Sequence, residues 1–212
     1  PAAEVDRPMN AIRVYRDDGP LAALLGRLGA AIPLWPVALL LIGLAPGAVA
    51  VALEGDGASE GLAAACAGWL VLCGGLSSGR PHDDRLRWMV PSLVRLGEYG
   101  TIVWLCAIAG GAAPAGAFAL LSVAAFRQYD LVYRLRTRGA VPPPWTAAVS
   151  LGWEGRVLLA LVLVVAGLVP GALYGVAGAL AVVLVGEAVH SWTSSLRVDA
   201  PDVYEDEEDE AA

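Results

Sequence analysis

The sequence predicts an all-α integral membrane protein, a bundle of six transmembrane helices preceded by an amphipathic interfacial helix. The first observation is composition: 57% of the 212 residues are hydrophobic and 17% are charged, against about 45–50% and about 25% in soluble domains. The second is that four long segments contain no Asp, Glu, Lys or Arg: 28–53, 61–79, 99–126 and 157–186. A helix needs about 20 apolar residues to cross the hydrocarbon core, and no two-residue alternation indicates a β-barrel.

The distribution of arginine decides the number of helices and their orientation. Turn signals interrupt two of the apolar segments, at 110–114 (Gly-Gly-Ala-Ala-Pro) and at 167–171 (Gly-Leu-Val-Pro-Gly), so each segment is either one helix or a hairpin. With six helices all 14 basic residues, every one an arginine, lie on one side. The opposite side then keeps only Glu54, Asp56 and Glu60 as charged residues. The positive-inside rule therefore predicts a multi-pass protein of the cell (plasma) membrane with both termini in the cytoplasm.

The elements follow in order. Residues 1–19 are expected to be an N-terminal linker. Residues 20–32 form the amphipathic helix, which begins at Asp17-Asp18-Gly19-Pro20 and lies on the membrane surface or, alternatively, packs on the bundle as a soluble helix would. The transmembrane domain is 33–192, and its predicted spans are 33–53, 59–78, 88–109, 114–137, 154–169 and 171–192.

Three further segments complete the prediction. Pro142-Pro143-Pro144-Trp145 is expected to be a stiff polyproline turn with its tryptophan at the headgroup level. The acidic segment 193–212 is expected to be a disordered cytoplasmic tail. The three cysteines, Cys66, Cys73 and Cys106, fall within apolar segments and are expected to be buried and unpaired.

Charged residues inside the predicted spans mark the candidate site, because such residues are costly in a membrane. All of them fall in the cytoplasmic half of the bundle. Equal numbers of acids and arginines favour a self-satisfied ion-pair network, and the alternative is a phosphate or headgroup site. A metal site, for Mg²⁺ or Mn²⁺, would use Glu98 and Asp130. The candidate cluster consists of Arg95, Glu98, Arg127, Asp130, Arg134, Glu154, Arg156, Glu187 and His190.

The other motifs are weaker evidence for a functional site. His82, Asp83 and Asp84 in the segment 80–87 could ligate a metal, but a solvated basic loop is the favoured interpretation. Gly171, Gly175 and Gly178 have the spacing of small residues at a close helix contact. The sequence contains no phosphate loop, dinucleotide fingerprint or hydrolase motif, and nothing in it predicts nucleic-acid binding.

Several segments together resemble an uncharacterised actinobacterial polytopic membrane domain. They are Trp88-Met89-Val90-Pro91, 95–101 (Arg-Leu-Gly-Glu-Tyr-Gly-Thr), 129–136 (Tyr-Asp-Leu-Val-Tyr-Arg-Leu-Arg), Pro143-Pro144-Trp145 and Gly152-Trp153-Glu154-Gly155-Arg156. That domain occurs C-terminal to, or beside, sugar-nucleotidyltransferase and CDP-alcohol phosphotransferase domains. The resemblance implies a place in phospholipid or phosphoglycolipid headgroup assembly, and it implies no activity.

The signature of the CDP-alcohol phosphotransferases themselves is not complete in this sequence. Only 18–22 (Asp-Gly-Pro-Leu-Ala) matches a fragment of it, while Tyr15 replaces its first aspartate and Ala23 its arginine. We therefore expect a non-catalytic membrane module, an anchor or accessory subunit whose partners are the lipid bilayer and a nucleotidyltransferase or CDP-alcohol phosphotransferase domain. The alternative is a divergent CDP-alcohol phosphotransferase-like enzyme or lipid-phosphate-binding protein that uses the charged cluster. A small transporter or flippase is the least favoured interpretation.

Overall fold

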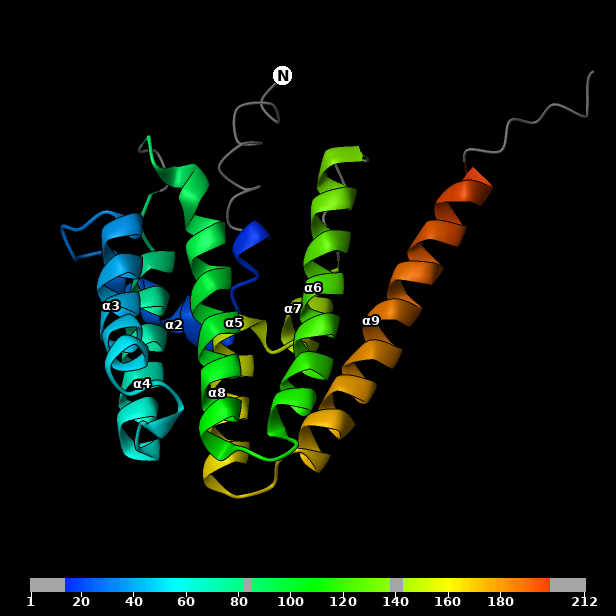
Figure 1. The fold of residues 1–212 in the computed structure, drawn as a ribbon. Helices are drawn as coiled ribbons and strands as arrows, with labels where there is room; N and C mark the ends of the chain where they lie inside the picture. The colour runs from blue at the N-terminus through cyan, green and yellow to red at the C-terminus, as the bar shows by residue number, and fades with distance from the viewer. Residues whose placement is uncertain (1–13, 82–84, 138–142, 199–212) are drawn as a thin grey trace, which may run out of the picture.

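The protein is all-helical, and its computed structural model describes residues 14–81, 85–137 and 143–198 (Figure 1). No strand occurs among these residues. A helical turn at 14–16 and two short 3-10 helices, Gly55–Gly57 and Arg87–Met89, accompany the main helices. The main helices are α2 (Pro20–Gly29), α3 (Pro36–Glu54), α4 (Glu60–Ser78), α5 (Val90–Ala109), α6 (Ala113–Thr137), α7 (Pro144–Val149), α8 (Gly152–Val165) and α9 (Gly171–Val198).

Five helical segments are long and apolar enough to cross a membrane. They are Pro36–Gly57, Glu60–Ser78, Arg87–Ala109, Trp145–Val165 and Gly171–Thr193. The fourth joins α7 to α8. Helix α6 is not among the five, although it has 25 residues, because its second half carries Arg127, Asp130, Arg134 and Arg136.

Local sequence sets the helix ends. Proline occupies the first turn of α2, α3, α5 and α7, where its missing N–H costs nothing. Ser59 caps α4 by accepting from the Leu62 N–H at 3.2 Å. Gly55 and Gly110 follow the last residues of α3 and α5 with positive φ, a conformation that glycine adopts without strain.

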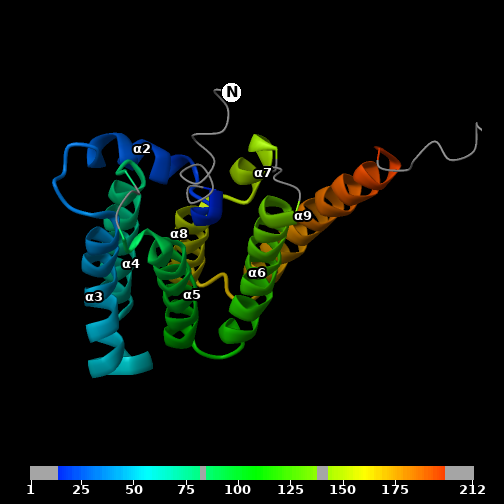
Figure 2. The ribbon, with the colours of Figure 1, turned by 90° about the horizontal axis from the view of Figure 1, so that it is seen from above.

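The long helices pack in neighbouring pairs, α3 with α4, α5 with α8 and α6 with α9. The core between them consists of apolar side chains, with Trp153 and Leu120 fully buried. Helix α9 leans away from the other helices toward its C-terminal end (Figures 1 and 2). Its main partner is α6, and it packs only slightly on α8, so most of its surface faces away from the bundle.

Helix α2 crosses the C-terminal end of α4 at very close range (Figure 2). A Cβ on Gly79 would overlap the Gly26 carbonyl group, and a Cβ on Gly29 would overlap the backbone of Leu76. Ser78 Oγ donates to the Ala22 carbonyl at 2.7 Å. Beyond the helix, Arg80 donates to the Ala30 and Leu34 carbonyls at 2.8 and 3.2 Å. Helix α2 is therefore docked on the bundle through backbone-to-backbone contact.

Replacing Gly79 by Ala is expected to separate α2 from α4, because the atoms that the new methyl group meets belong to the backbone. We expect a loss of about 1–3 kcal/mol in the free energy of unfolding, as for other overpacked sites. Thermal unfolding of the purified protein in detergent measures it. The matched control is Gly61→Ala at the other end of α4, where a Cβ meets nothing within 4 Å; equal stability of the two variants would contradict the expectation.

The structure changes several predicted elements. The sixth predicted helix, which is α9, continues to Val198 instead of ending at 192, because 193–198 contains few helix-breaking residues. Residues 144–149 form α7 instead of a polyproline turn, since Pro144 stands at the first turn, where proline favours a helix. The predicted close contact at Gly171, Gly175 and Gly178 is wrong within this chain, because a Cβ there meets nothing within 4 Å. Residues 14–19 are not a linker: they enter the bundle.

Candidate functional site: a buried ion-pair network

Residues 15–19, called the strap below, lie among the helices, and the helices bind the strap's backbone carbonyl groups. Gln128 Nε2 in α6 donates to the Tyr15 carbonyl at 3.2 Å. Arg95 in α5 donates to the Arg16 carbonyl. The Trp153 N–H at the start of α8 donates to the Asp17 carbonyl at 3.1 Å. Three helices that are far apart in the sequence thus hold one short segment.

The Arg16 side chain of the strap is fully buried and bonds to α4. Its guanidinium group donates to Ser77 Oγ at 3.1 Å and to the Gly74 carbonyl at 3.0 Å. It also pairs with Asp18 at 2.8 Å, and Asp18 accepts from the Trp153 indole N–H at 2.9 Å. Each charge of this pair therefore has a second partner in the bundle, which is the condition under which buried charges are tolerated.

Asp17 lies at the centre of the network. Its carboxylate accepts from Arg127 Nε in α6 at 3.1 Å and from Arg156 Nη2 in α8 at 3.0 Å. Its φ of 52° is in the left-handed region, which is uncommon for residues other than glycine but is tolerated by Asp and Asn. The backbone conformation directs the carboxylate to the position between the two arginines.

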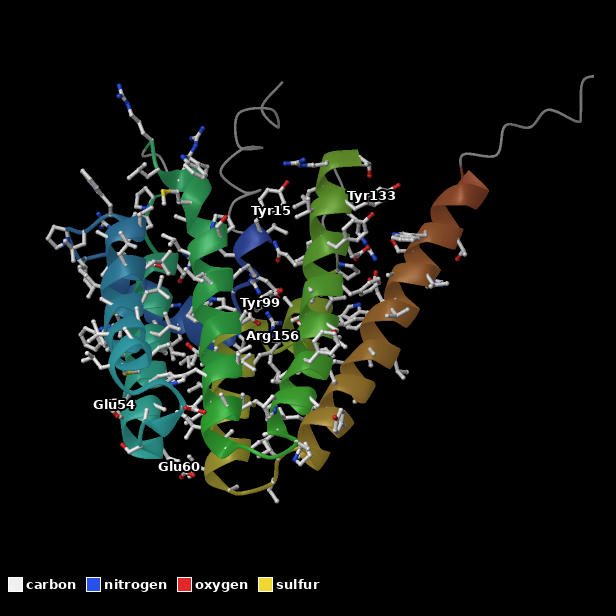
Figure 3. The ribbon with its side chains drawn as sticks, in the orientation of Figure 1. Tyr15, Glu54, Glu60, Tyr99, Tyr133 and Arg156 are labelled. Atoms are coloured by element: carbon white, nitrogen blue, oxygen red, sulfur yellow. The ribbon has the colours of Figure 1, made fainter. Side chains whose placement is uncertain are left out.

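Arg156 and Glu98 continue the network between α8 and α5. Arg156 Nε donates to Glu98 at 2.6 Å, and Arg156 Nη1 donates to the Ser150 carbonyl at 2.9 Å. The second Glu98 oxygen pairs with Arg95. Arg156 lies between the helices, near Tyr99, while Glu54 and Glu60 lie at the far end of α3 and α4 (Figure 3). Both Arg156 and Glu98 are almost completely buried.

Glu154 has a different role from the one that charge counting predicts. Its two oxygens accept from the backbone N–H groups of Gly19 and Ala22 at 3.1 and 2.9 Å. These groups belong to the first turn of α2, whose N–H donors have no partner within the helix. Glu154 in α8 therefore caps α2, and a carboxylate at a helix N-terminus is also electrostatically favourable.

A second, smaller cluster joins α6 to α9. Arg134 pairs with Asp130 at 2.8 Å and binds Glu187 through two hydrogen bonds of 3.0 and 2.8 Å. It also donates to Ser191 Oγ at 3.1 Å. This α6–α9 cluster has two carboxylates for one arginine, and Asp130 Oδ1 is buried with no hydrogen-bond partner among the described residues.

Replacing Glu187 by Gln is expected to weaken the attachment of α9 to α6, because the amide keeps only one acceptor oxygen and loses the charge. Hydrogen bonds to charged groups contribute about 1.5–3 kcal/mol, so we expect a loss of about that size in the free energy of unfolding. Denaturant titration in detergent measures it. Glu60→Gln, at an exposed position in α4, should leave stability unchanged; a change of similar size in both variants would refute the expectation.

The predicted site residues therefore fall into two groups. Arg95, Glu98, Arg127 and Arg156 join the network around the strap, and Glu154 caps α2 beside it. Asp130, Arg134 and Glu187 form the α6–α9 cluster, and His190 lies one turn after Glu187 on α9. No group of three or more His, Cys, Asp or Glu close enough for a metal ion occurs in 14–81, 85–137 and 143–198. The sequence motif at 82–84 lies outside these residues.

Sequence reasoning missed Arg16, Asp17 and Asp18 as members of the site. They precede the first apolar segment, so they were assigned to a linker and to a helix start. The acids Asp17 and Asp18 stand next to Arg16, but equal numbers of acids and arginines within the predicted spans gave no reason to seek further partners outside them. The network around the strap contains four arginines and four carboxylates: Arg16, Arg95, Arg127, Arg156, Asp17, Asp18, Glu98 and Glu154.

The chain belongs to a family of unknown function (DUF5941), whose sequence profile matches residues 6–212. The matched range covers both charged clusters and all the helices described above. No match is found among curated proteins, and none among solved structures.

Proposed function

Taking membership of this family as the premise, we propose that the chain is a non-catalytic membrane module. It acts as an anchor or accessory subunit in the assembly of phospholipid or phosphoglycolipid headgroups. The observation that carries the proposal is that each carboxylate of the network around the strap accepts from the protein's own donors. Among its donors, Arg95 Nε is buried without a hydrogen-bond partner in the described residues. A catalytic or phosphate-binding site needs charged groups that are free to interact with a ligand. In this network the carboxylates are bonded to other groups of the protein.

The proposed topology adds α6 to the five candidate spans. This gives six spans, with both termini on the cytoplasmic side. The arginines among the described residues support this orientation, because they belong to the half of the bundle where α3, α5 and α8 begin. Exposed aromatic residues gather at the same end, among them Trp35, Trp88 and Trp145, as in the aromatic belt of a membrane interface. The charges of α6 are compatible with a span because Arg127 and Arg134 point inward and are paired.

The strap fits an anchoring role. The strap lies near the N-terminal end of the described residues, and it is bonded to α4, α5, α6 and α8. Any part of the protein on its N-terminal side is therefore tied to a fixed point of the bundle, at the arginine-rich end. A cytoplasmic nucleotidyltransferase or a membrane phosphotransferase domain is the partner that the family resemblance implies.

Purification from the native host in a mild detergent tests the proposal. We expect a nucleotidyltransferase or a CDP-alcohol phosphotransferase to co-purify with the tagged chain, and the chain alone to give no turnover with CDP-alcohols. Co-purification should be lost when the tagged chain carries Gly79→Ala and Asp17→Asn together, which disturb the docked end of the bundle. Absence of any such enzyme from the wild-type preparation would refute the proposal.

The second candidate, a divergent CDP-alcohol phosphotransferase-like enzyme or lipid-phosphate-binding protein, is favoured by one observation. The α6–α9 cluster holds an excess carboxylate, and Asp130 Oδ1 is buried without a partner among the described residues. A divalent cation there would use oxygen ligands, as Mg²⁺ and Mn²⁺ do. The test is turnover of CDP-alcohols by the purified chain with either metal. Under this alternative Asp130→Asn abolishes turnover while the fold remains.

A further inference from the structure

A groove of about 670 Å³ runs between α3 and α4, on the opposite half of the bundle from the strap. Its lining is apolar apart from Glu54, and the residues used below are Ile42, Ala45, Pro46, Glu54, Cys66 and Trp69. Both walls belong to segments that are long and apolar enough to cross a membrane, Pro36–Gly57 and Glu60–Ser78. The groove therefore opens toward the hydrocarbon region of the bilayer.

The end of the groove within the bilayer is closed by a hydrogen bond between the two helices. Pro46 lies inside α3 and has no N–H, so the Ile42 carbonyl one turn earlier loses its helical donor. The Trp69 indole N–H from α4 replaces that donor at 3.0 Å. This bond fixes the Trp69 ring at the groove, where 42% of the residue's surface stays exposed.

The length of the groove matches one leaflet. The twelve steps along the helix from Ile42 to Glu54 correspond to about 18 Å at 1.5 Å per residue. Half of the hydrocarbon core of a bilayer is about 15 Å. A single extended acyl chain from the leaflet at the acidic end therefore has the length of this groove, with its headgroup placed beside Glu54.

The mouth of the groove is acidic and fixed in position. Glu54, Asp56 and Glu60 are exposed there, and the Trp104 indole N–H holds the loop by donating to the Gly55 carbonyl at 2.8 Å. The segments that reach this end of the bundle, 49–65, 105–118 and 161–176, contain no Arg, Lys or His. The mouth thus repels anionic headgroups and attracts cationic ones.

We propose that this groove binds one acyl chain of a bilayer lipid whose headgroup carries an ammonium group, with the ammonium beside Glu54, Asp56 and Glu60. The groove supplies the apolar contact, and the three carboxylates supply the selection among headgroups. The site does not depend on the function proposed above.

Quenching of Trp69 fluorescence tests the site. The protein is placed in phosphatidylglycerol vesicles, whose headgroups carry no ammonium, with a minor fraction of lipid with brominated chains, either phosphatidylethanolamine or phosphatidylglycerol. The difference between wild type and Trp69→Phe isolates the Trp69 signal. We expect about twofold stronger quenching by the brominated phosphatidylethanolamine, the preference that one exposed ion pair provides. Replacing Glu54, Asp56 and Glu60 by their amides should remove the preference but leave the quenching.

Filling the groove provides the control. Ala45→Phe places a ring in the groove and should abolish the excess quenching, whereas Val182→Phe on α9, at a position that is 76% exposed, should not. Should Trp69→Phe fail to fold, native mass spectrometry of wild type and Ala45→Phe compares the retained phosphatidylethanolamine directly. Equal quenching by the two lipids, no effect of Ala45→Phe, or a change of oligomeric state in Ala45→Phe would each overturn the proposal.

Discussion

Replacing Arg156 by Met is expected to lower the free energy of unfolding by about 3–5 kcal/mol, the range for breaking a buried ion pair. Arg156 has three partners, Asp17, Glu98 and the Ser150 carbonyl, and it is 1% exposed. Methionine fills much of the same volume, so the loss comes from the unpaired carboxylates and not from a cavity. Because the partners belong to the strap, to α5 and to the segment before α8, the effect should extend over the whole bundle.

The buried cysteines allow unfolding of the protein to be measured by thiol labelling. Cys66, Cys73 and Cys106 are free and buried, but Cys66 lines the groove between α3 and α4, so labelling of Cys73 and Cys106 by a fluorescent thiol reagent reports the opening of α4 and α5. We expect the midpoint of labelling on heating to fall strongly in Arg156→Met. It should fall nearly as much in Arg156→Lys, because one ammonium group cannot reach three acceptors in the geometry of a guanidinium group.

Arg136→Met is the matched control, since Arg136 is exposed near the end of α6. Surface substitutions of this kind usually change stability by less than about 0.5 kcal/mol. The expectation would be wrong if Arg156→Met and Arg136→Met unfolded at the same temperature, or if Arg156→Lys kept the wild-type midpoint.

The parts of the fold that hydropathy controls could be predicted from the sequence. The structure has a helix in each of the six predicted ranges, and most ends agree within three residues, because apolar segments, proline and glycine set them locally. The sixth predicted helix differs most, continuing to Val198 instead of ending at 192, and the fifth ends at Val165 instead of 169. There Gly167 with positive φ stops the helix before the proline does.

The partners of the buried charges could not be predicted in the same way. Spacing along one helix indicates pairs such as Arg95 with Glu98 and Asp130 with Arg134, and both pairs occur. The pairs of Asp17 with Arg127 and Arg156 join residues that are far apart in the sequence. They depend on the left-handed turn at Asp17 and on the path of the strap into the bundle, and hydropathy carries no information on either.

Asp17→Asn is expected to produce the second large effect. Asparagine keeps the size of the side chain and tolerates the left-handed conformation, so the change isolates the negative charge. Without that charge Arg127 and Arg156 remain buried with too little compensation, and we expect a loss of about 3–5 kcal/mol in the free energy of unfolding. Asp56→Asn, at an exposed position in the loop between α3 and α4, should have no measurable effect.

Release of the strap has its own readout, because Arg16 is a trypsin site that is fully buried in the folded protein. We expect cleavage after Arg16 to be much faster in Asp17→Asn than in wild type at a temperature where both remain folded. Cleavage after Arg27, which is exposed on α2, should change little. If Asp17→Asn kept the stability of wild type and its resistance to trypsin at Arg16, the charge of Asp17 would not be what holds the strap.

Combining Asp17→Asn with Arg127→Met separates the loss of a pair from the burial of an unpaired charge. The single Asp17 variant leaves Arg95, Arg127 and Arg156 with Glu98 as their shared carboxylate, whereas the double variant removes Arg127 and leaves only Arg95 and Arg156 on Glu98. Residues that share a charge network show interaction energies of about 0.5–3 kcal/mol. We therefore expect the double variant to be more stable than the sum of the single losses predicts. Strict additivity would mean that Asp17 and Arg127 act independently, and that the strap is held by its backbone hydrogen bonds instead of by its charge.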